Sequence, residues 1–243
     1  VLSELVNARR VAKQFGQQRS HRLEHFGRNG RGRVVVEVMA LHGITILSVH
    51  AQRPRHLNYG LRPYRPFAGV MKGVIAGIAP RARVIDISHD VAVHNVVEAA
   101  FVIAEAWPYF PKGTIHVVVV DPGVGTSRRP ILAEAAGHFF LAPDNGVLSM
   151  VFDAVPHKVR MISNPKLMRR EISRTFHGRD VFAPAAAHLA KGVRPSACGK
   201  LIRDYVRVWL SKPSECGPNR WRGTILKVDH FGNLITNFAA RDF

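Results

Sequence analysis

The sequence predicts an α/β fold, with a large domain built on a mainly parallel sheet flanked by helices and a small β-rich domain after it. Strand-like runs alternate with segments of helical spacing between residues 67 and 193, an order typical of parallel α/β sheets. The run IHVVVV at 115–120 is apolar throughout, as in a strand covered on both faces. After about Arg194 the helical spacing fades, and WRGTILKVDHFGNLITNF at 221–238 is typical of paired strands.

The first quarter of the chain differs in charge from the rest. Residues 1–66 hold 12 Lys or Arg against 3 Glu, a net +9, and residues 67–243 hold 23 Lys or Arg against 14 Asp or Glu, another +9. We predict a basic irregular extension over residues 1–42 and a strand at GITILS (43–48). Residues 49–66 contain no acidic residue and have neither helical nor strand periodicity, which predicts a long basic loop.

The first predicted helix spans FAGVMKGVIAGIA at 67–79. Val70, Val74 and Ile78 recur at four-residue intervals, which predicts an amphipathic helix. Pro80 ends the helix, because proline lacks the backbone N–H that a further turn needs.

Further elements follow in alternation. VIDIS at 84–88 predicts a strand, Asn95 to Tyr109 a helix closed by proline, and ILAEA, HFFLA and KVRMIS three more strands. Asp180 is predicted as the N-cap of a helix from Val181 to Lys191, which ends at Gly192.

The composition excludes several classes of protein. Hydrophobic residues make up 47% and charged residues 21%, as in an ordinary globular protein. Cys198 and Cys216 form no CxxC pattern, which argues against a disulfide framework or a structural zinc site and favours a reducing cytoplasm. The longest apolar run, Val34 to Val49, is too short to span a bilayer. The net charge of +18 favours an acidic partner, but half of the excess lies in residues 1–66 and no nucleic-acid-binding motif accompanies it.

Two segments carry residues suited to chemistry. Asp121 begins DPGVGTSRR at the carboxyl end of a predicted strand, where ligands bind in α/β sheets. A plain turn in which Asp121 caps backbone N–H groups is the alternative, since the loop lacks a nucleotide-binding glycine pattern. His177 in TFHGRD precedes a predicted helix, whose N-terminus favours a neutral imidazole. The chain holds 13 His, so a core or surface role is the alternative there.

Three further polar clusters are flanked by apolar runs: VIDISHD (84–90), APDNG (142–146) and VDHFGN (228–233). Each is consistent with a simple Asx or glycine turn between strands. Each is also consistent with a site residue at a strand end, Asp86 in the first of them.

Taken together, the motifs resemble a known family. The chain carries, in family order, GVMKGVIAGIAPRARVIDISHDV, YFPKGTIHVVVVDPGVGTSRRPI, LAPDNGVLS, FHGRDVFAPAAAHLAKG and VDHFGNLITN. They resemble the S-adenosyl-L-methionine (SAM) hydroxide adenosyltransferases, relatives of SAM-dependent fluorinases and chlorinases, over residues 67–237. The resemblance implies hydrolysis of SAM to adenosine and L-methionine by water-derived hydroxide attack at C5′. SAM is then the substrate, and no metal or other cofactor is expected.

The resemblance also implies residue roles. The triad that holds the attacking water falls on Asp121, Arg128 and His177, of which the Asp and His accept the water's protons and the Arg stabilises hydroxide. The halogenases lack this Asp, so hydrolysis is favoured over the alternative of a SAM-dependent halogenase. The resemblance implies four further substrate-binding residues: Asp229 and Asn233 hold the methionine amino group and the adenine edge, Phe231 lines the pocket, and Asn145 lies near the ligand.

The chain departs from the family pattern at both ends. The family's T/S-D-F-G motif, whose Asp binds the ribose hydroxyls, is absent after GITILS; we interpret the aberrant stretch 49–66 as translation in a shifted reading frame, with a basic presequence as the alternative. Family members continue for several strands that complete a small β-barrel, so we expect a truncated barrel and impaired activity. Family trimers place the site between two subunits, which implies a homotrimer here.

The predicted organisation is therefore an extension (1–42), an α/β domain (43–193) and a linker with a partial C-terminal β domain (194–243). The alternative from another functional class is a basic nucleic-acid-binding module, which the few aromatic residues among the basic ones and the absence of a recognisable binding motif disfavour.

Overall fold

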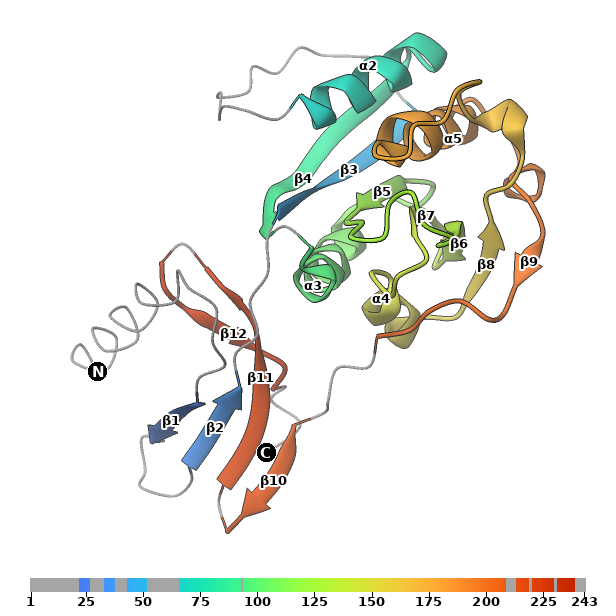
Figure 1. The fold of residues 1–243 in the computed structure, drawn as a ribbon. Helices are drawn as coiled ribbons and strands as arrows, with labels where there is room; N and C mark the ends of the chain where they lie inside the picture. The colour runs from blue at the N-terminus through green and yellow to red at the C-terminus, as the bar shows by residue number, and fades with distance from the viewer. Residues whose placement is uncertain are drawn as a thin grey trace. The chain divides into compact units, whose positions relative to one another are not determined.

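The structure, a computed structural model, describes residues 22–26, 33–37, 43–51, 66–92, 94–208, 213–218, 220–229 and 231–238 (Figure 1). Two compact units divide the chain: His42–Val208 forms the larger, and Val1–Leu41 with Trp209–Phe243 forms the smaller. Residues 194–208, predicted as linker, belong to the larger unit. Most of the predicted basic loop, residues 52–65, lies outside the described residues.

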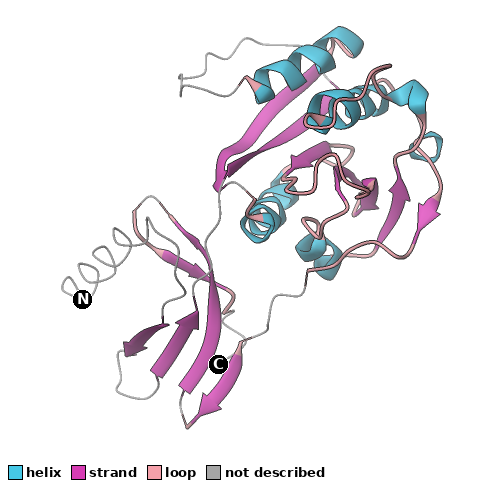
Figure 2. Cartoon of the chain, in the orientation of Figure 1, coloured by secondary structure: helices cyan, strands magenta, loops and turns pink. Residues whose placement is uncertain are grey.

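Seven strands of the larger unit form one sheet in the order β4-β3-β5-β7-β6-β8-β9 (Figure 2). Their bounds are β3 (Gly43–Ala51), β4 (Ala82–Ala92), β5 (Ile115–Val119), β6 (Pro130–Ala135), β7 (His138–Pro143), β8 (His157–Met161) and β9 (Leu201–Ile202). The α-helices are α2 (Phe67–Ile78), α3 (Val96–Ala106), α4 (Ser149–Ala154) and α5 (Ala183–Ala190). Short helical turns complete the unit: η1 (Trp107–Tyr109), η2 (Pro165–Leu167), the π-helical η3 (Gly178–Phe182) and η4 (Pro195–Ala197).

The prediction of a mainly parallel sheet is wrong. Among the described strands of this sheet only β5 and β7 pair in parallel, and the other neighbours are antiparallel. One physical cause is a tight hairpin between β6 and β7, where Ala136 and Gly137 both have positive φ, 49° and 83°. Two such residues form the turn that suits the twist of a hairpin, and the residues AAGH carry no clear turn signal. The fold is α/β with a mixed sheet.

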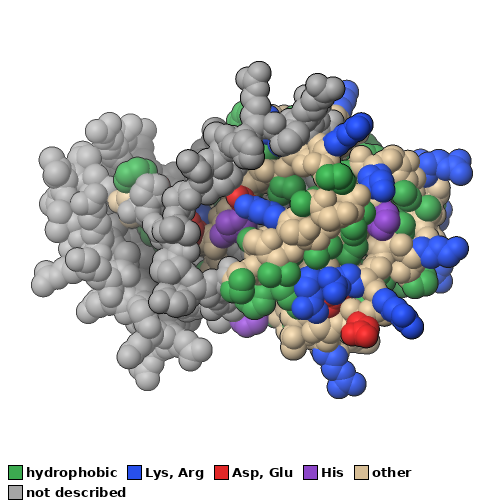
Figure 3. Space-filling view, turned by 90° about the horizontal axis from the view of Figure 1, so that it is seen from above, with side chains coloured by type: hydrophobic (Ala, Val, Ile, Leu, Met, Phe, Trp, Pro, Cys, Tyr) green, Lys and Arg blue, Asp and Glu red, His purple; other side chains and the backbone are tan. Residues whose placement is uncertain are grey.

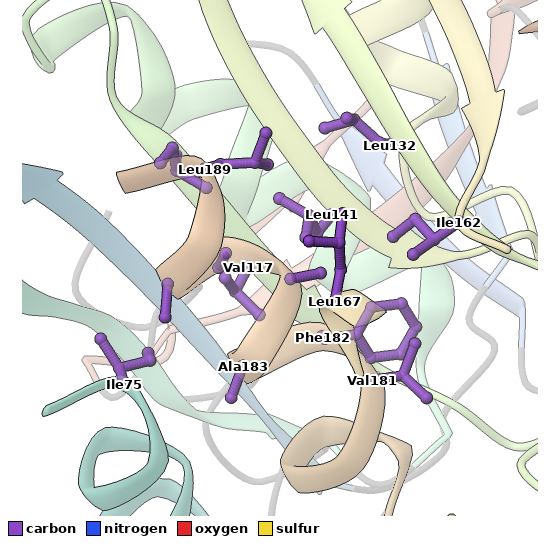
Figure 4. Close-up of a cluster of buried hydrophobic side chains, with 14 of the residues drawn as sticks. Ile75, Val117, Leu132, Leu141, Ile162, Leu167, Val181, Phe182, Ala183 and Leu189 are labelled. Atoms are coloured by element: carbon purple, nitrogen blue, oxygen red, sulfur yellow. The ribbon is translucent and has the colours of Figure 1, made fainter. Parts of the chain in front are cut away.

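Helices cover both faces of the sheet, with α2 and α5 on one face and α3 and α4 on the other (Figure 1). The alternation of side chains along β5 separates the two cores: Val117 faces the α2 and α5 side, and Val118 faces the α3 and α4 side. Figure 4 shows the first core, in which Leu141 and Phe182 are fully buried near α5. The prediction that the 115–120 run is covered on both faces is confirmed.

The predicted helix at 67–79 is confirmed as α2, and Val74 and Ile78 pack partly buried against the core. Met71 and Ile75 are buried, whereas Val70 is 37% exposed. Apolar residues occupy two adjacent four-residue series in this segment, so spacing alone does not select the face that meets the sheet.

The predicted helix after Asn95 is confirmed as α3 followed by η1. The side chain of Asn95 accepts a hydrogen bond from the backbone N–H of Glu98 at 2.9 Å, and Oε2 of Glu98 accepts one from Asn95 Nδ2. This reciprocal pair satisfies donors at the start of the helix and fixes where it begins.

Asp180 is not the N-cap of the last helix, so this prediction is wrong. It lies inside η3, and the π turn continues directly into α5. Its carboxylate is fully buried and accepts hydrogen bonds from Ser173 and Arg179. The predicted end at Gly192 is confirmed, since this residue has φ of 93° and follows α5 closely.

The smaller unit contains β1 (Arg22–Phe26), β2 (Arg33–Glu37), β10 (Ser214–Gly217), β11 (Arg220–Val228) and β12 (Leu234–Thr236). The strands β1 and β2 correct the prediction of an irregular extension, and β2 pairs with β11 in parallel. The predicted pairing of strands within 221–238 is confirmed by the antiparallel β11 and β12. A barrel stays a prediction. None of the helices in the described part of the chain is long and apolar enough to cross a membrane.

Candidate active site

Arg128 links Asp121 to His177 just beyond the end of β5. Its Nε donates a hydrogen bond to Oδ1 of Asp121 at 2.8 Å, and its Nη2 bonds Oδ2 of the same carboxylate. Nη2 also lies 2.8 Å from Nδ1 of His177. The side chains of Asp121 and Arg128 are only 6% and 8% exposed, so water screens their attraction little. The three predicted catalytic side chains form one hydrogen-bonded cluster, in which Asp121 and Arg128 are buried and His177 is half-buried.

A compact loop, residues 121–129, presents two members of this cluster. Thr126 fastens it internally, because its Oγ1 donates to the carbonyl of Gly123 at 2.7 Å and accepts from the N–H of Arg128 at 3.3 Å. Gly125 has φ of 80°, and a Cβ there would lie 2.4 Å from the carbonyl oxygen of Arg174. Only glycine fits this close approach, which brings the loop against the segment that leads to His177.

A second segment, residues 173–182, carries His177 at the start of η3. The buried carboxylate of Asp180 accepts hydrogen bonds from the N–H of Ser173 at 2.9 Å and from Nε of Arg179 at 2.6 Å. Gly178 packs close to α2, since a Cβ there would lie 2.8 Å from Sδ of Met71. Charge compensation by the arginine keeps the pKa of Asp180 lowered despite its burial. The π-helical turn is thus anchored on both sides.

The geometry assigns a protonation state to His177. A guanidinium only donates, so Nδ1 of His177 accepts from Arg128 and carries no proton. Burial first, and then the positive charge of Arg128, lowers the pKa of His177; the carboxylates of Asp121 and Asp180 and a hydrogen bond to the backbone of Ser173 oppose this shift. The imidazole is therefore neutral at pH 7, with its proton on Nε2.

One donor of the cluster remains open. Nη1 of Arg128 is buried and has no hydrogen-bond partner among the residues that the structure describes. A buried unpaired donor costs roughly 1–3 kcal/mol. The guanidinium carbon of Arg128 also lies 5.5 Å from the centre of the Phe182 ring, which holds the group in place from one side. A small oxygen ligand would satisfy the open donor.

Asn145 lies beside the cluster and is tied to the sheet. Its Nδ2 donates to the carbonyl of Val120 at 2.6 Å, and its Oδ1 accepts from the N–H of Val147 at 3.2 Å. The residue thus contacts the strand end that precedes Asp121.

The other predicted substrate residues belong to the smaller unit. Oδ1 of Asp229 accepts from the N–H groups of Phe231 and Asn233, and its Oδ2 accepts from Nδ2 of Asn233 at 2.7 Å. These bonds make an Asx-type turn that leaves the Phe231 ring 63% exposed. Within the described ranges, no group of three or more His, Cys, Asp or Glu residues could hold a metal ion.

Sequence reasoning missed the charged residues that support the cluster, namely the buried Asp144 and Asp180 and the partly exposed Arg129. Asp144 is 2% exposed in its side chain and pairs with Arg129, fifteen residues away. The sequence PDN at 143–145 predicts only a local turn. It gives no sign of the ion pair, because the partner of Asp144 lies on another loop.

The segment that carries this cluster is shared with a known family. A family model described as the SAM hydroxide adenosyltransferase N-terminal domain matches residues 59–199, which include the whole Asp–Arg–His cluster. The chain belongs to the SAM hydroxide adenosyltransferase family.

Relatives of this family member include proteins named (R)-S-adenosyl-L-methionine hydrolase. One from Salinispora arenicola is 40% identical over 73% of the chain and 68% of the relative, and one from Thermus thermophilus is 37% identical over 74% and 71%. A protein named fluorinase from an Actinoplanes strain is 29% identical over 70% and 66%. A solved structure of an uncharacterized conserved protein from Thermotoga maritima aligns with a TM-score of 0.67 and 41% identity, covering 72% of the chain and 67% of that protein. The predicted family resemblance is confirmed.

Proposed function

We propose that the protein hydrolyses SAM to adenosine and L-methionine by attack of water-derived hydroxide on C5′. The observation that carries the proposal is the hydrogen-bonded cluster of Asp121, Arg128 and His177, whose Asp and Arg side chains are buried. Relatives named SAM hydrolase, 33–40% identical, support the same reaction, and those named fluorinase are more distant at 25–29%.

The main requirement of the reaction is a water molecule positioned to attack C5′. The water oxygen forms a bond to C5′ while the C5′–S bond breaks, and the electron pair of the broken bond stays on sulfur. Methionine leaves as a neutral thioether, so no general acid is needed, and one water proton must be removed. Since hydroxide and sulfonium cancel their charges on the way to products, a water-poor pocket favours the step.

The cluster supplies the two groups that this step needs. The open Nη1 of Arg128 is suited to hold the water oxygen as it gains hydroxide character. Each carboxylate oxygen of Asp121 has a second lone pair beside its bond to Arg128, so Asp121 is the proposed proton acceptor. Because Nδ1 of His177 already accepts from Arg128, this histidine orients the guanidinium instead of taking the proton.

Substrate binding and assembly belong to the same proposal. We assign Asn145, Asp229, Phe231 and Asn233 to the methionine and adenine parts of SAM, in a cytoplasmic homotrimer whose sites lie between subunits. No metal or other cofactor is required by this chemistry, since the sulfonium is already an activated leaving group.

A decisive experiment incubates the purified chain with SAM in ¹⁸O-labelled water without halide. We expect equal amounts of adenosine and methionine, with ¹⁸O in the 5′-hydroxyl of adenosine. Asp121→Asn is expected to lower kcat by on the order of 10²- to 10⁴-fold, because it removes the proton acceptor. The matched control is Asp153→Asn, an exposed aspartate that also pairs with an arginine.

Other products would redirect the assignment. A 5′-halogenated adenosine formed only when chloride or fluoride is added would indicate a halogenase. If the chain neither binds nor consumes SAM but binds DNA with a steep salt dependence, the nucleic-acid alternative replaces this proposal.

A further inference from the structure

Asp144 and Asn145, which follow β7, hold both ends of the loop that carries the catalytic cluster. Asn145 bonds the carbonyl of Val120, immediately before Asp121. At the other end, the N–H of Asp144 donates to the carbonyl of Arg129 at 2.8 Å, immediately after Arg128. The loop is therefore held at Val120, just before it begins, and at Arg129, its last residue, by two neighbours in sequence.

The side chains of Asp144 and Arg129 reinforce this clamp. Oδ2 of Asp144 accepts from Nε and Nη2 of Arg129 at 2.9 and 2.7 Å. The geometry is that of a fork on one carboxylate oxygen, and the Asp144 side chain is 2% exposed. Charge-assisted bonds of this kind to a buried carboxylate fix the direction of the backbone that bears them.

The same carboxylate also binds the segment that leaves the larger unit. Its Oδ1 accepts from the N–H of Val206 at 2.8 Å, and Nη1 and Nη2 of Arg129 bond the carboxylate and carbonyl of Asp204 at 3.0 and 2.7 Å. Asp144 thus satisfies both of its oxygens by joining two stretches of chain that are distant in sequence, the catalytic loop and residues 204–206.

A role in stability alone does not require this arrangement. A buried ion pair contributes little net stability compared with apolar residues of the same size, because desolvation offsets its attraction. An ion pair does fix the relative position of its two side chains. Here it fixes the position of Arg129, the neighbour of Arg128.

We propose that Asp144 is a positioning residue for SAM hydrolysis, which acts through Arg129 to hold Arg128 and Asp121 at the attacking water. This inference rests on the proposed function. A displacement of about 1 Å in such a group lowers the rate on the order of 10²-fold, while substrate binding by more distant groups is kept. A displaced loop is therefore expected to lower kcat and to leave KM nearly unchanged.

The test compares Asp144→Asn with the control Asp153→Asn. The asparagine keeps the size of Asp144 but turns one oxygen into an NH₂ group, which faces either Arg129 or the N–H of Val206, both donors. Asp153 on α4 pairs with Arg207, which lies in the same 204–208 segment as the partners of Asp144. Both variants are assayed well below their melting temperatures.

Two readouts are measured on the same samples: kcat and KM for SAM, and hydrogen–deuterium exchange of the peptide covering residues 120–129. For Asp144→Asn we expect kcat lower by roughly 10- to 100-fold, KM within about threefold, and faster exchange in that peptide. For Asp153→Asn we expect both readouts close to wild type. The double variant Asp144→Ala with Arg129→Ala, which leaves no lone buried charge, should fold and show the same loss of kcat.

Each outcome decides. Wild-type kcat and unchanged exchange in Asp144→Asn overturn the inference. A matching decrease of kcat in both variants also overturns it, since the effect would then come from the 204–208 segment. If wild type yields no adenosine, the proposed function fails, and the exchange of residues 120–129 still decides whether Asp144 holds the loop.

Discussion

Arg128 is the residue on which the site depends, because three of its groups have different tasks. Nε and Nη2 neutralise Asp121, Nη2 also binds His177, and the buried Nη1 stays open among the described residues. The planar fork of an arginine fits this division, whereas a lysine ammonium would reach one partner at a time.

The protonation of His177 leads to a prediction on pH. The folded-state pKa of His177 is lowered by burial and by Arg128, so the neutral form persists from high pH down to below its ordinary value of 6.5. Protonation removes the acceptor of Arg128 and adds a positive charge near the sulfonium of SAM. We expect kcat to be level near pH 7 and to fall only below pH 6.5, the ordinary pKa of histidine. The measurement is kcat as a function of pH. For His177→Asn we expect a lower kcat at every pH and no further decrease of kcat at acidic pH. If the decrease at acidic pH is the same as in wild type, another group causes it.

At the scale of single elements, the sequence predicted the helices and strands whose position depends on residues close together in the chain. The helices at α2 and α3 and the strands β5 to β8 followed from periodicity and proline, and the triad followed from family resemblance. The direction of the strands depended on a hairpin at Ala136 and Gly137, a turn without a strong signal. The partners of Asp144 lie on segments distant in the chain, and Asp180 bonds Ser173 only once the turn between them has folded. No local sequence pattern indicates either set of contacts.

The catalytic loop gives an element-scale prediction on stability. Gly125→Ala places a Cβ 2.4 Å from the Arg174 carbonyl and forces a φ of 80° on alanine. We expect a loss of about 1–3 kcal/mol in the free energy of unfolding and a lower kcat. The matched control is Gly73→Ala in α2, where nothing lies within 4 Å, and there we expect a gain of up to about 1 kcal/mol. Urea unfolding measures both; equal effects would contradict the close packing of the loop on residues 173–177.

At the scale of the whole molecule, a buried histidine pair links stability to pH. Nε2 of His116 on β5 lies 3.2 Å from Nδ1 of His138 on β7, and His116 is fully buried. Burial, with a smaller effect of His138, lowers the pKa of His116 to about 3. The unfolded chain, with a pKa near 6.5, binds more protons below that pH than the folded chain does.

The free energy of unfolding is therefore expected to be constant above about pH 7 and to fall as the pH drops from 6.5 toward 3. One such histidine contributes a slope of up to about 1.4 kcal/mol per pH unit. His116→Phe keeps an aromatic ring beside Phe110 and Phe140 and removes the titrating group. Urea unfolding at several pH values should give a shallower slope for this variant, and an identical slope would show that other groups cause the acid sensitivity.

The net charge of the whole chain leads to the last prediction. The formal net charge is +18, and on the face drawn in Figure 3 Lys and Arg side chains outnumber Asp and Glu. SAM carries a net positive charge near pH 7, so the long-range field of the protein opposes its approach. The local cluster does not add to this field, because Asp121 neutralises Arg128.

Salt shortens the range of that repulsion, to about 10 Å at 0.1 M ionic strength and less above it. We therefore expect KM for SAM to decrease by a few-fold as halide-free salt such as potassium acetate is raised, while kcat stays constant because the buried cluster is little screened. The control is S-adenosylhomocysteine, which lacks the sulfonium charge and whose inhibition constant should change less. A KM that rises with salt would mean that the pocket attracts SAM through charges of its own, against the sign of the whole molecule.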